Sequence, residues 1–231
     1  MKSQQKEEIF MIIKCKRNFI MTGVLFLLFA VFTAIVTHVD VQQIGPEQSS
    51  VGLASLNQFV LNLFGVNLLW YNITDWLGVV AILFAIGFAA LVLCQLIKRK
   101  SLLKVDHQIL LLGGFYVLVV AIYVFFELVV INYRPIILHT SLEASYPSSH
   151  TMIVICIMAT AMLEFHRLFQ NQKTWLRLLD SVSVLLIAVT VVGRLISGVH
   201  WFTDIVAAVI LSAALVALYY SVTVFIGEKN K

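Results

Sequence analysis

Long apolar segments with few charged residues alternate with short polar stretches along the chain. Six of these segments have lengths close to the roughly 20 residues that a helix needs to cross the hydrocarbon of a bilayer. They cover residues 18–37, 76–97, 109–131, 147–165, 181–196 and 201–226. The pattern predicts an all-α, polytopic membrane protein with six transmembrane helices. The polar stretch 166–180 is expected to connect the fourth and fifth helices.

Residues 38–74, between the first two spans, contain no Lys or Arg. Apolar side chains recur there at helical spacing, at Leu53, Leu56, Phe59, Val60, Leu63 and Phe64. This spacing predicts a short amphipathic helix that lies on the outer membrane surface, with Ser49 or Ser50 as its N-cap. Aromatic residues that favour a membrane interface follow at Trp70, Tyr71 and Trp76.

The composition agrees with a membrane protein, since 61% of the residues are hydrophobic, 12% are charged and the mean hydropathy is +0.96. A soluble domain is nearer half apolar and a quarter charged. The length of 231 residues suits one helical bundle, so we expect a single domain over residues 1–231. The three cysteines, Cys15, Cys94 and Cys156, form no metal-binding or disulfide pattern, and we expect no cofactor.

Six spans put both termini on the same side of the membrane. Fourteen of the 16 Lys and Arg residues fall in the terminal and connecting segments on that side. The positive-inside rule makes it the cytoplasm, so we expect a multi-pass plasma-membrane protein with residues 1–17 in the cytoplasm. Because these residues act as topology signals, the net charge of +4 does not indicate a nucleic-acid partner. The two exceptions, Arg134 and Arg194, are expected on the outer face.

Three polar clusters contain these two arginines and most of the candidate chemistry. They are Tyr133-Arg134-Pro135, then Pro147-Ser148-Ser149-His150, and finally Arg194 with His200 and Asp204. Each cluster adjoins the outer end of a predicted span. A bundle of six helices can therefore place all three around one pocket.

His200 and Asp204 are four residues apart, so they share one face if they lie on a helix. A carboxylate bonded to one imidazole nitrogen fixes the tautomer and leaves the other nitrogen free to attack. The alternative is an ordinary pair at the start of a helix, where aspartate is a common cap. His150 is a candidate acid–base partner because it belongs to the same predicted pocket.

Arg134 and Arg194 carry guanidinium groups, which suit phosphate oxygens. The alternative for both is contact with lipid headgroups by snorkelling side chains. The start of the fourth span, at Ser148 and Ser149, offers backbone N–H groups and the positive end of a helix dipole, which together bind anions. Ser148 is equally suited to capping that helix. These residues predict a site for a phosphate group.

The three clusters resemble the signature of the type 2 phosphatidic acid phosphatase family, which reads Lys-x6-Arg-Pro, Pro-Ser-Gly-His and Ser-Arg-x5-His-x3-Asp. The matching segments here are Arg134-Pro135, Pro147-Ser148-Ser149-His150, and Gly193-Arg194 with His200 and Asp204. The motifs cover residues 127–204. The six-span pattern extends the resemblance to most of the chain.

The resemblance implies a metal-independent phosphohydrolase in which His200 attacks phosphorus and forms a phosphohistidine, while Asp204 orients its ring. It implies that His150 protonates the leaving oxygen and then activates water. The groups that it implies for holding the phosphoryl oxygens are Arg134, Arg194 and the backbone amides of Ser148 and Ser149. Such transfer needs mainly positioning and charge stabilisation, which agrees with the chemistry of these residues.

Three positions depart from the family signature, with Ser149 for Gly, Gly193 for Ser and Glu127 for the Lys. Glu127 precedes Arg134 by nearly two helical turns, which predicts that they share a face with Glu127 about 10 Å deeper. We expect Glu127 to pair with Arg134 or Arg194, to be protonated by burial, or to alter the substrate or the activity. His139 is a candidate for replacing the lost positive charge, or else an exposed loop residue.

The sequence therefore predicts hydrolysis of a lipid phosphate or pyrophosphate from the bilayer at the outer face. The chain resembles bacterial enzymes that recycle undecaprenyl pyrophosphate or dephosphorylate phosphatidylglycerophosphate or similar phosphatidates. One alternative is a lipid phosphotransferase, in which another acceptor replaces water. A second is a lipid-phosphate binding or transport protein with a degenerate site, which Glu127 favours. Internal repeats or broken helices, which a transporter is expected to show, are not convincing here.

Overall fold

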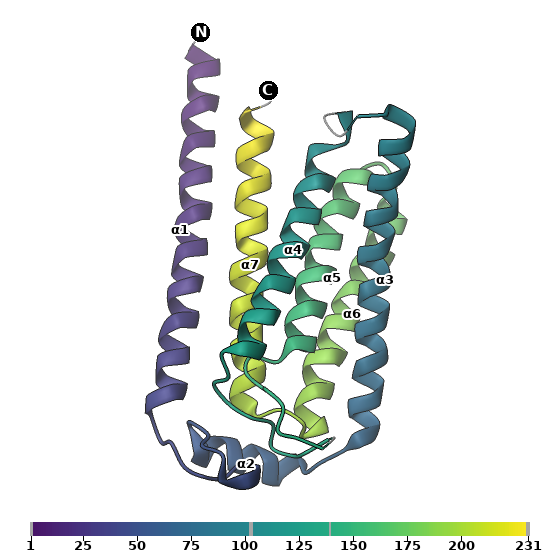
Figure 1. Cartoon of the computed structure of the whole chain (residues 1–231). Helices are drawn as coiled ribbons and strands as arrows, with labels where there is room; N and C mark the ends of the chain where they lie inside the picture. The colour runs from purple at the N-terminus through teal and green to yellow at the C-terminus, as the bar shows by residue number, and fades with distance from the viewer. Residues whose placement is uncertain (1, 102–103, 139, 230–231) are drawn as a thin grey trace.

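The computed structural model describes residues 2–101, 104–138 and 140–229. Six long helices run side by side through it (Figure 1). They are α1 (Lys2–His38), α3 (Leu68–Arg99), α4 (His107–Leu128), α5 (Ser149–Leu168), α6 (Lys173–Ser197) and α7 (Phe202–Lys229). All six contain a stretch long and apolar enough to cross a membrane, which confirms the predicted all-α, six-span architecture. That residues 1–231 form one domain stays a prediction.

Two helices, α5 and α7, form the centre of the bundle. Half of the most apolar stretch of each is buried inside the protein, against 11% for α1. The largest buried cluster joins them to α3 and α4 through Phe88, Leu112, Phe115, Met152, Cys156, Leu211, Leu215 and Tyr219. The outer helices expose long rows of Leu, Ile, Val and Phe, which in a membrane face lipid rather than water.

The short helix α2 (Ala54–Phe64) lies across one end of the bundle, which we call the α2 end; both termini lie at the other (Figure 1). Its position confirms the helix predicted from the apolar spacing. Leu56, Phe59 and Leu63 are 41%, 65% and 63% exposed, so one face of α2 is apolar and free to contact a membrane surface. A one-turn 3-10 helix, η1 (Pro46–Gln48), precedes it.

The start of α2 differs from the prediction, because neither Ser49 nor Ser50 caps it. Leu53 is the N-cap residue, with a φ of 46° and no side-chain hydrogen bond. Its N–H donates to the carbonyl of Val39 at 2.9 Å, and the next N–H donates to the carbonyl of Asp40 at 2.9 Å. These carbonyls just beyond α1, together with the Asp40 carboxylate, which accepts from the N–H of Ser55 at 2.7 Å, replace the expected serine cap.

A buried amide ties α2 to the first turn of α7. The side chain of Asn57 donates to the carbonyl of Gly52 at 2.8 Å and lies 3.0 Å from the hydroxyl of Thr203. The backbone N–H of Thr203 donates back to the Asn57 oxygen at 3.1 Å. The helix on the surface thus stabilises the backbone immediately before Asp204.

The helix ends differ from the predicted spans where polar residues belong to helices. The helix α3 begins at Leu68, because the Asn67 side chain accepts from the N–H groups of Leu69 and Trp70 at 3.1 and 3.3 Å. Trp70 and Tyr71 therefore lie in a helix rather than in a connecting segment. The predicted connector 166–180 is mostly helical, since α5 ends at Leu168 and α6 begins at Lys173.

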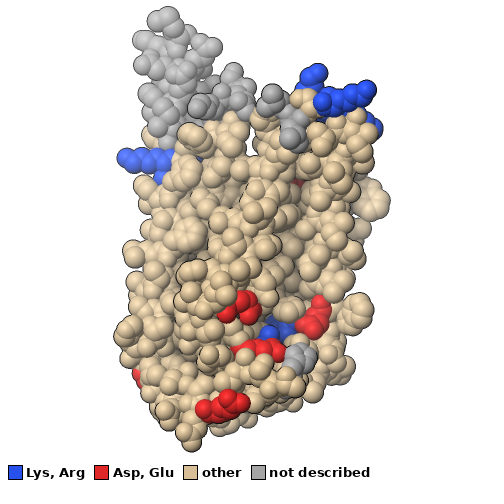
Figure 2. Space-filling view, viewed as in Figure 1, with Lys and Arg blue, Asp and Glu red and all other residues tan. Residues whose placement is uncertain are grey.

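The charges divide between the two ends of the bundle. In Figure 2, Lys and Arg gather at the end that carries the termini, whereas acidic side chains gather toward the α2 end around a small basic patch. In the described part of the chain, the basic residues toward the α2 end are Arg134 and Arg194. This asymmetry is the one that the sequence predicted.

Candidate active site

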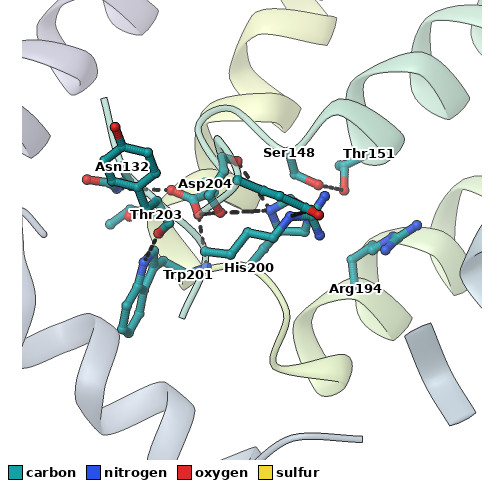
Figure 3. Close-up of polar contacts among 12 residues, drawn as sticks. Asn132, Ser148, Thr151, Arg194, His200, Trp201, Thr203 and Asp204 are labelled. Carbon is teal, nitrogen blue, oxygen red and sulfur yellow. Dashed lines mark hydrogen bonds and ion pairs between the residues drawn. The ribbon is translucent and has the colours of Figure 1, made fainter. Parts of the chain in front are cut away.

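The residues of the three clusters come together at the α2 end. Arg134 lies in the loop between α4 and α5, His150 in the first turn of α5, Arg194 in the last turn of α6, His200 in the α6–α7 turn and Asp204 in the first turn of α7. Figure 3 shows several of them converging from these segments. The positive charges of Arg134 and Arg194 both lower the pKa of His200, as expected of groups that share one site.

The ring of His200 is buried and oriented by Ser145. Its Nδ1 lies 3.0 Å from the hydroxyl of Ser145 and 3.2 Å from the carbonyl of the same residue. Because a carbonyl only accepts, Nδ1 carries the proton and the lone pair is on Nε2. That Nε2 is buried and has no hydrogen-bond partner among the described residues. The ring therefore presents one free nucleophilic nitrogen.

The environment keeps this ring neutral. Burial lowers the pKa of His200 well below its usual value, and the charges of Arg134 and Arg194 lower it further. An imidazole with a depressed pKa is unprotonated at neutral pH. The lone pair on Nε2 is then available for attack.

Asp204 is linked to His200 through the hydroxyl of Ser145 rather than by the expected direct hydrogen bond. Its nearest oxygen lies 4.0 Å from His200 Nδ1. The hydroxyl of Ser145 donates to that oxygen at 2.5 Å, and the N–H of Trp201 donates to it at 2.9 Å. The amide of Asn132 donates to the other oxygen at 3.1 Å. The carboxylate is fully buried, and these three donors compensate its loss of water.

Sequence reasoning missed Ser145 because it belongs to no motif and lies one residue before the Tyr146-Pro147 segment. The loop that carries it is positioned by backbone contacts. Tyr133 and Ala144 form an antiparallel bridge, and the N–H of Ser145 donates to the carbonyl of Asn132 at 2.9 Å. The same contacts place Arg134 beside the site.

The guanidinium groups of Arg134 and Arg194 each contact a carboxylate and each retain unused donors. Arg134 Nε lies 2.9 Å from Glu143 Oε2, and Arg194 Nη2 contacts Asp75 Oδ1. Arg134 Nη1, together with Arg194 Nε and Nη1, is buried without a hydrogen-bond partner among the described residues. Such buried donors leave the site suited to an additional anion.

Asp75, in the second turn of α3, is a site residue that the sequence did not reveal. Its Oδ1 contacts Arg194 Nη2 and also lies 3.1 Å from His150 Nε2. It stands 59 residues before Arg134, at the boundary of a predicted span and outside every motif. The only available signal was a carboxylate at the outer end of a transmembrane helix.

The serines at the start of α5 are placed differently from the expectation. Ser148 is the N-cap residue, but its hydroxyl bonds to Thr151 at 3.0 Å and caps no backbone N–H. Its own N–H donates to the carbonyl of Asp204 at 3.0 Å, so this amide is not free to hold a phosphate. Ser149 lines a small crevice together with Glu127.

Three expectations for Glu127 are wrong. The helix α4 ends at Leu128, so Glu127 and Arg134 do not share a helix face. Glu127 is exposed rather than buried, and in the ranges that the structure describes no ion pair joins it to Arg134 or Arg194. The remaining expectation, that Glu127 alters the substrate or the activity, stays a prediction. His139, the other candidate modulator, lies outside the described residues.

The glycine that stands for the family's serine has a steric cause. A Cβ on Gly193 would lie 2.5 Å from Thr74 Cγ2 and 3.0 Å from Trp70 Cε3. These atoms belong to the first turns of α3, which pack directly against the last turns of α6. Gly193 therefore permits the close approach that brings α3 beside Arg194.

We expect Gly193→Ser to destabilise the protein by about 1–3 kcal/mol through overpacking, and to lower activity by shifting Arg194. Thermal unfolding and phosphate release measure the two effects. Adding Thr74→Ser, which removes Cγ2, should restore part of both. Gly87→Ala in α3 is the matched control, because a Cβ there meets no atom within 4 Å. A Gly193→Ser protein as stable as wild type would contradict the steric explanation.

Comparison with known proteins identifies the same region of the chain. The model of the PAP2 superfamily matches residues 129–227, which include both arginines, both histidines and Asp204 of the site. Comparison with curated protein sequences finds no match.

The fold is similar to the crystal structure of the first transmembrane PAP2 type phosphatidylglycerolphosphate phosphatase from Bacillus subtilis. The TM-score is 0.58 at 17% sequence identity, and the match covers 91% of this chain and 97% of that one. The shared fold thus extends well beyond the motifs. Together, the family match over residues 129–227 and the shared fold make this chain similar to membrane phosphatases of the PAP2 type.

Proposed function

We propose that this protein hydrolyses a lipid phosphate or pyrophosphate through a phosphohistidine at His200. The observation that carries the proposal is the state of this ring: Nδ1 is bonded to Ser145, while Nε2 is buried and has no partner in the described parts of the chain. The guanidinium groups of Arg134 and Arg194 retain buried, unused N–H donors. A nucleophilic nitrogen close to guanidinium groups that retain unused N–H donors fits phosphoryl transfer.

In the first proposed step, His200 Nε2 attacks phosphorus and the bond from phosphorus to the lipid-side oxygen breaks. The arginines stabilise the charge on the phosphoryl oxygens, and protonated His150 gives its proton to the leaving oxygen. The developing positive charge on the His200 ring is stabilised through Ser145 by Asp204.

In the second proposed step, neutral His150 takes a proton from water, whose oxygen attacks phosphorus. The bond from phosphorus to His200 Nε2 breaks and releases the phosphate. Both steps use only positioning, proton transfer and the charges of Arg134 and Arg194, so we propose a metal-independent reaction. No group of three metal-binding side chains occurs in the part of the chain that is described.

We propose that the α2 end faces the outside of the cell and that both termini are cytoplasmic. The support is the charge asymmetry, since basic residues gather at the end that carries the termini (Figure 2). The substrate then reaches the site from the outer leaflet of the plasma membrane. Undecaprenyl pyrophosphate, phosphatidylglycerophosphate and phosphatidate are the candidates.

A panel of these three lipids, incubated with the purified protein and a chelator, tests the proposal. We expect phosphate release from at least one lipid without added metal. If wild type releases none, or if His200→Ala releases as much as wild type, the proposed hydrolysis is wrong. Adding lipid alcohols as acceptors distinguishes transfer from hydrolysis, because transfer forms a new lipid phosphate without free phosphate.

We expect Glu127→Lys to lower the KM for the preferred lipid phosphate several-fold, because it replaces an exposed negative charge beside Ser149 by a positive one. The effect should shrink with added salt, as it does for exposed charges. Glu47→Lys is the control, since Glu47 is also exposed at the α2 end but lies in η1. An unchanged KM and an unchanged lipid preference would show that the charge of Glu127 does not affect substrate binding.

A further inference from the structure

One carboxylate oxygen holds two of the proposed phosphate-handling groups at once. Asp75 Oδ1 contacts Arg194 Nη2 and lies 3.1 Å from His150 Nε2. An oxygen between a guanidinium and an imidazole has the surroundings that a phosphoryl or leaving-group oxygen needs in the proposed reaction. Asp75 is not part of the region that matches the PAP2 superfamily.

We propose that Asp75 is a displaceable counter-ion, which occupies these contacts in the free protein and yields them to the phosphate of the substrate. The proposal rests on the proposed function, because it assigns Arg194 and His150 to phosphate binding. It makes Asp75 a residue that sets which anions the site accepts.

The burial of Arg194 explains why a counter-ion is needed. The side chain is fully buried, and an uncompensated charge in such a place strongly destabilises a protein. Asp75 supplies the opposite charge from the neighbouring helix, and the ring of Tyr71 lies 4.9 Å from the guanidinium carbon. In Figure 3 the guanidinium of Arg194 is drawn on the side remote from the ring of His200.

The packing of α3 fixes the backbone near Asp75 but leaves the Asp75 side chain free to move. Gly78, one turn after Asp75, packs under His150, where a Cβ would lie 3.2 Å from the ring carbon Cδ2. The backbone of α3 is thus fixed against the site. The Asp75 side chain remains 37% exposed, so the carboxylate can turn toward water when another anion takes its contacts.

A counter-ion that must be displaced makes the site selective among anions. An anionic ligand must replace Asp75 in its contacts with Arg194 and His150 and then bind close to the negative charge of Asp75. The bilayer holds a phosphate attached to a lipid at high effective concentration near the site, whereas free inorganic phosphate has no such advantage. We infer that Asp75 weakens the binding of the released product more than that of the membrane-held substrate.

Binding of inorganic phosphate to the full-length protein in detergent tests this inference, with Asp75→Asn as the main variant. Asparagine keeps an oxygen for Arg194 and His150 but removes the charge. We expect its Kd for phosphate to fall about tenfold, which corresponds to about 1.4 kcal/mol. Phosphate should also raise its thermal unfolding midpoint more than that of wild type. Asp75→Ser serves as a second variant if asparagine impairs folding.

Asp180→Asn is the matched control, because Asp180 also pairs with a histidine, His166, at 2.8 Å but at the opposite end of the bundle. Its Kd for phosphate should equal that of wild type. An unchanged or higher Kd in the Asp75 variants overturns the proposal and would make Asp75 a positioning residue for His150.

Lipid-phosphate hydrolysis, measured on the same preparations, separates this inference from the proposed function. Tighter phosphate binding by Asp75→Asn with no hydrolysis by wild type would support the counter-ion and reject the hydrolase. Hydrolysis by wild type with unaltered phosphate binding in the variant would do the opposite.

Discussion

Replacing His200 by alanine is expected to lower kcat for lipid-phosphate hydrolysis by about 10⁴-fold or more, since loss of a covalent nucleophile removes the reaction path itself. Among the described residues, the His200 side chain makes hydrogen bonds only through Nδ1, to Ser145, so the fold should survive the loss of the ring. Phosphate release and thermal unfolding of the variant check both statements.

A substrate with a good leaving group separates the roles of the two histidines. Nitrophenolate leaves p-nitrophenyl phosphate without a proton, so the first step no longer needs His150. We expect His150→Ala to release a burst of nitrophenolate and to accumulate phosphoenzyme, because the second step lacks its base. His200→Ala should give neither burst nor phosphoenzyme.

His166→Ala is the control for the loss of an imidazole, because His166 is more than half exposed at the opposite end of the bundle. It should behave as wild type in every assay. Phosphoenzyme that persists in His200→Ala would place the nucleophile elsewhere. A His150→Ala protein without any burst would show that His150 is needed before the phosphohistidine forms.

The length of the apolar segments was sufficient to predict the six spans, because a helix in lipid satisfies its backbone internally and exposes apolar side chains to the lipid. The motif spacing and the span order then placed the residues of the candidate site together, since Arg134, His150, Arg194 and His200 each adjoin a span end. The surface helix α2 was also predictable, because its apolar residues repeat at helical spacing. These features depend on local sequence alone.

The remaining features depend on contacts between distant segments. Asp75 reaches the site only because Gly193 allows α3 to approach α6, and Ser145 because a loop bridge turns it toward His200. Glu127 was misplaced because the apolar residues after Leu128 continue the hydrophobic pattern although the helix has ended. A pattern of hydrophobic residues does not mark where a helix stops when no cap or glycine is present.

The indirect link between Asp204 and His200 leads to the second large effect, which we expect for Asp204→Asn. An amide in place of the carboxylate cannot accept from both Ser145 and Trp201 while also receiving the Asn132 amide. The positive charge that develops on the His200 ring then loses the carboxylate that stabilises it through Ser145. By analogy with triad aspartates, kcat should fall by about 10³–10⁴-fold.

Ser145→Ala tests whether the hydroxyl is the link. We expect a kcat loss of about 10–100-fold, smaller than for Asp204→Asn, because the Ser145 carbonyl still accepts from Nδ1 at 3.2 Å. Since all three Asp204 donors support the loop as well, unfolding temperatures must accompany the rates. A variant that keeps its stability but loses kcat separates orientation of the ring from folding. If Ser145→Ala matches wild type, the carboxylate must close the 4.0 Å gap and act on His200 directly.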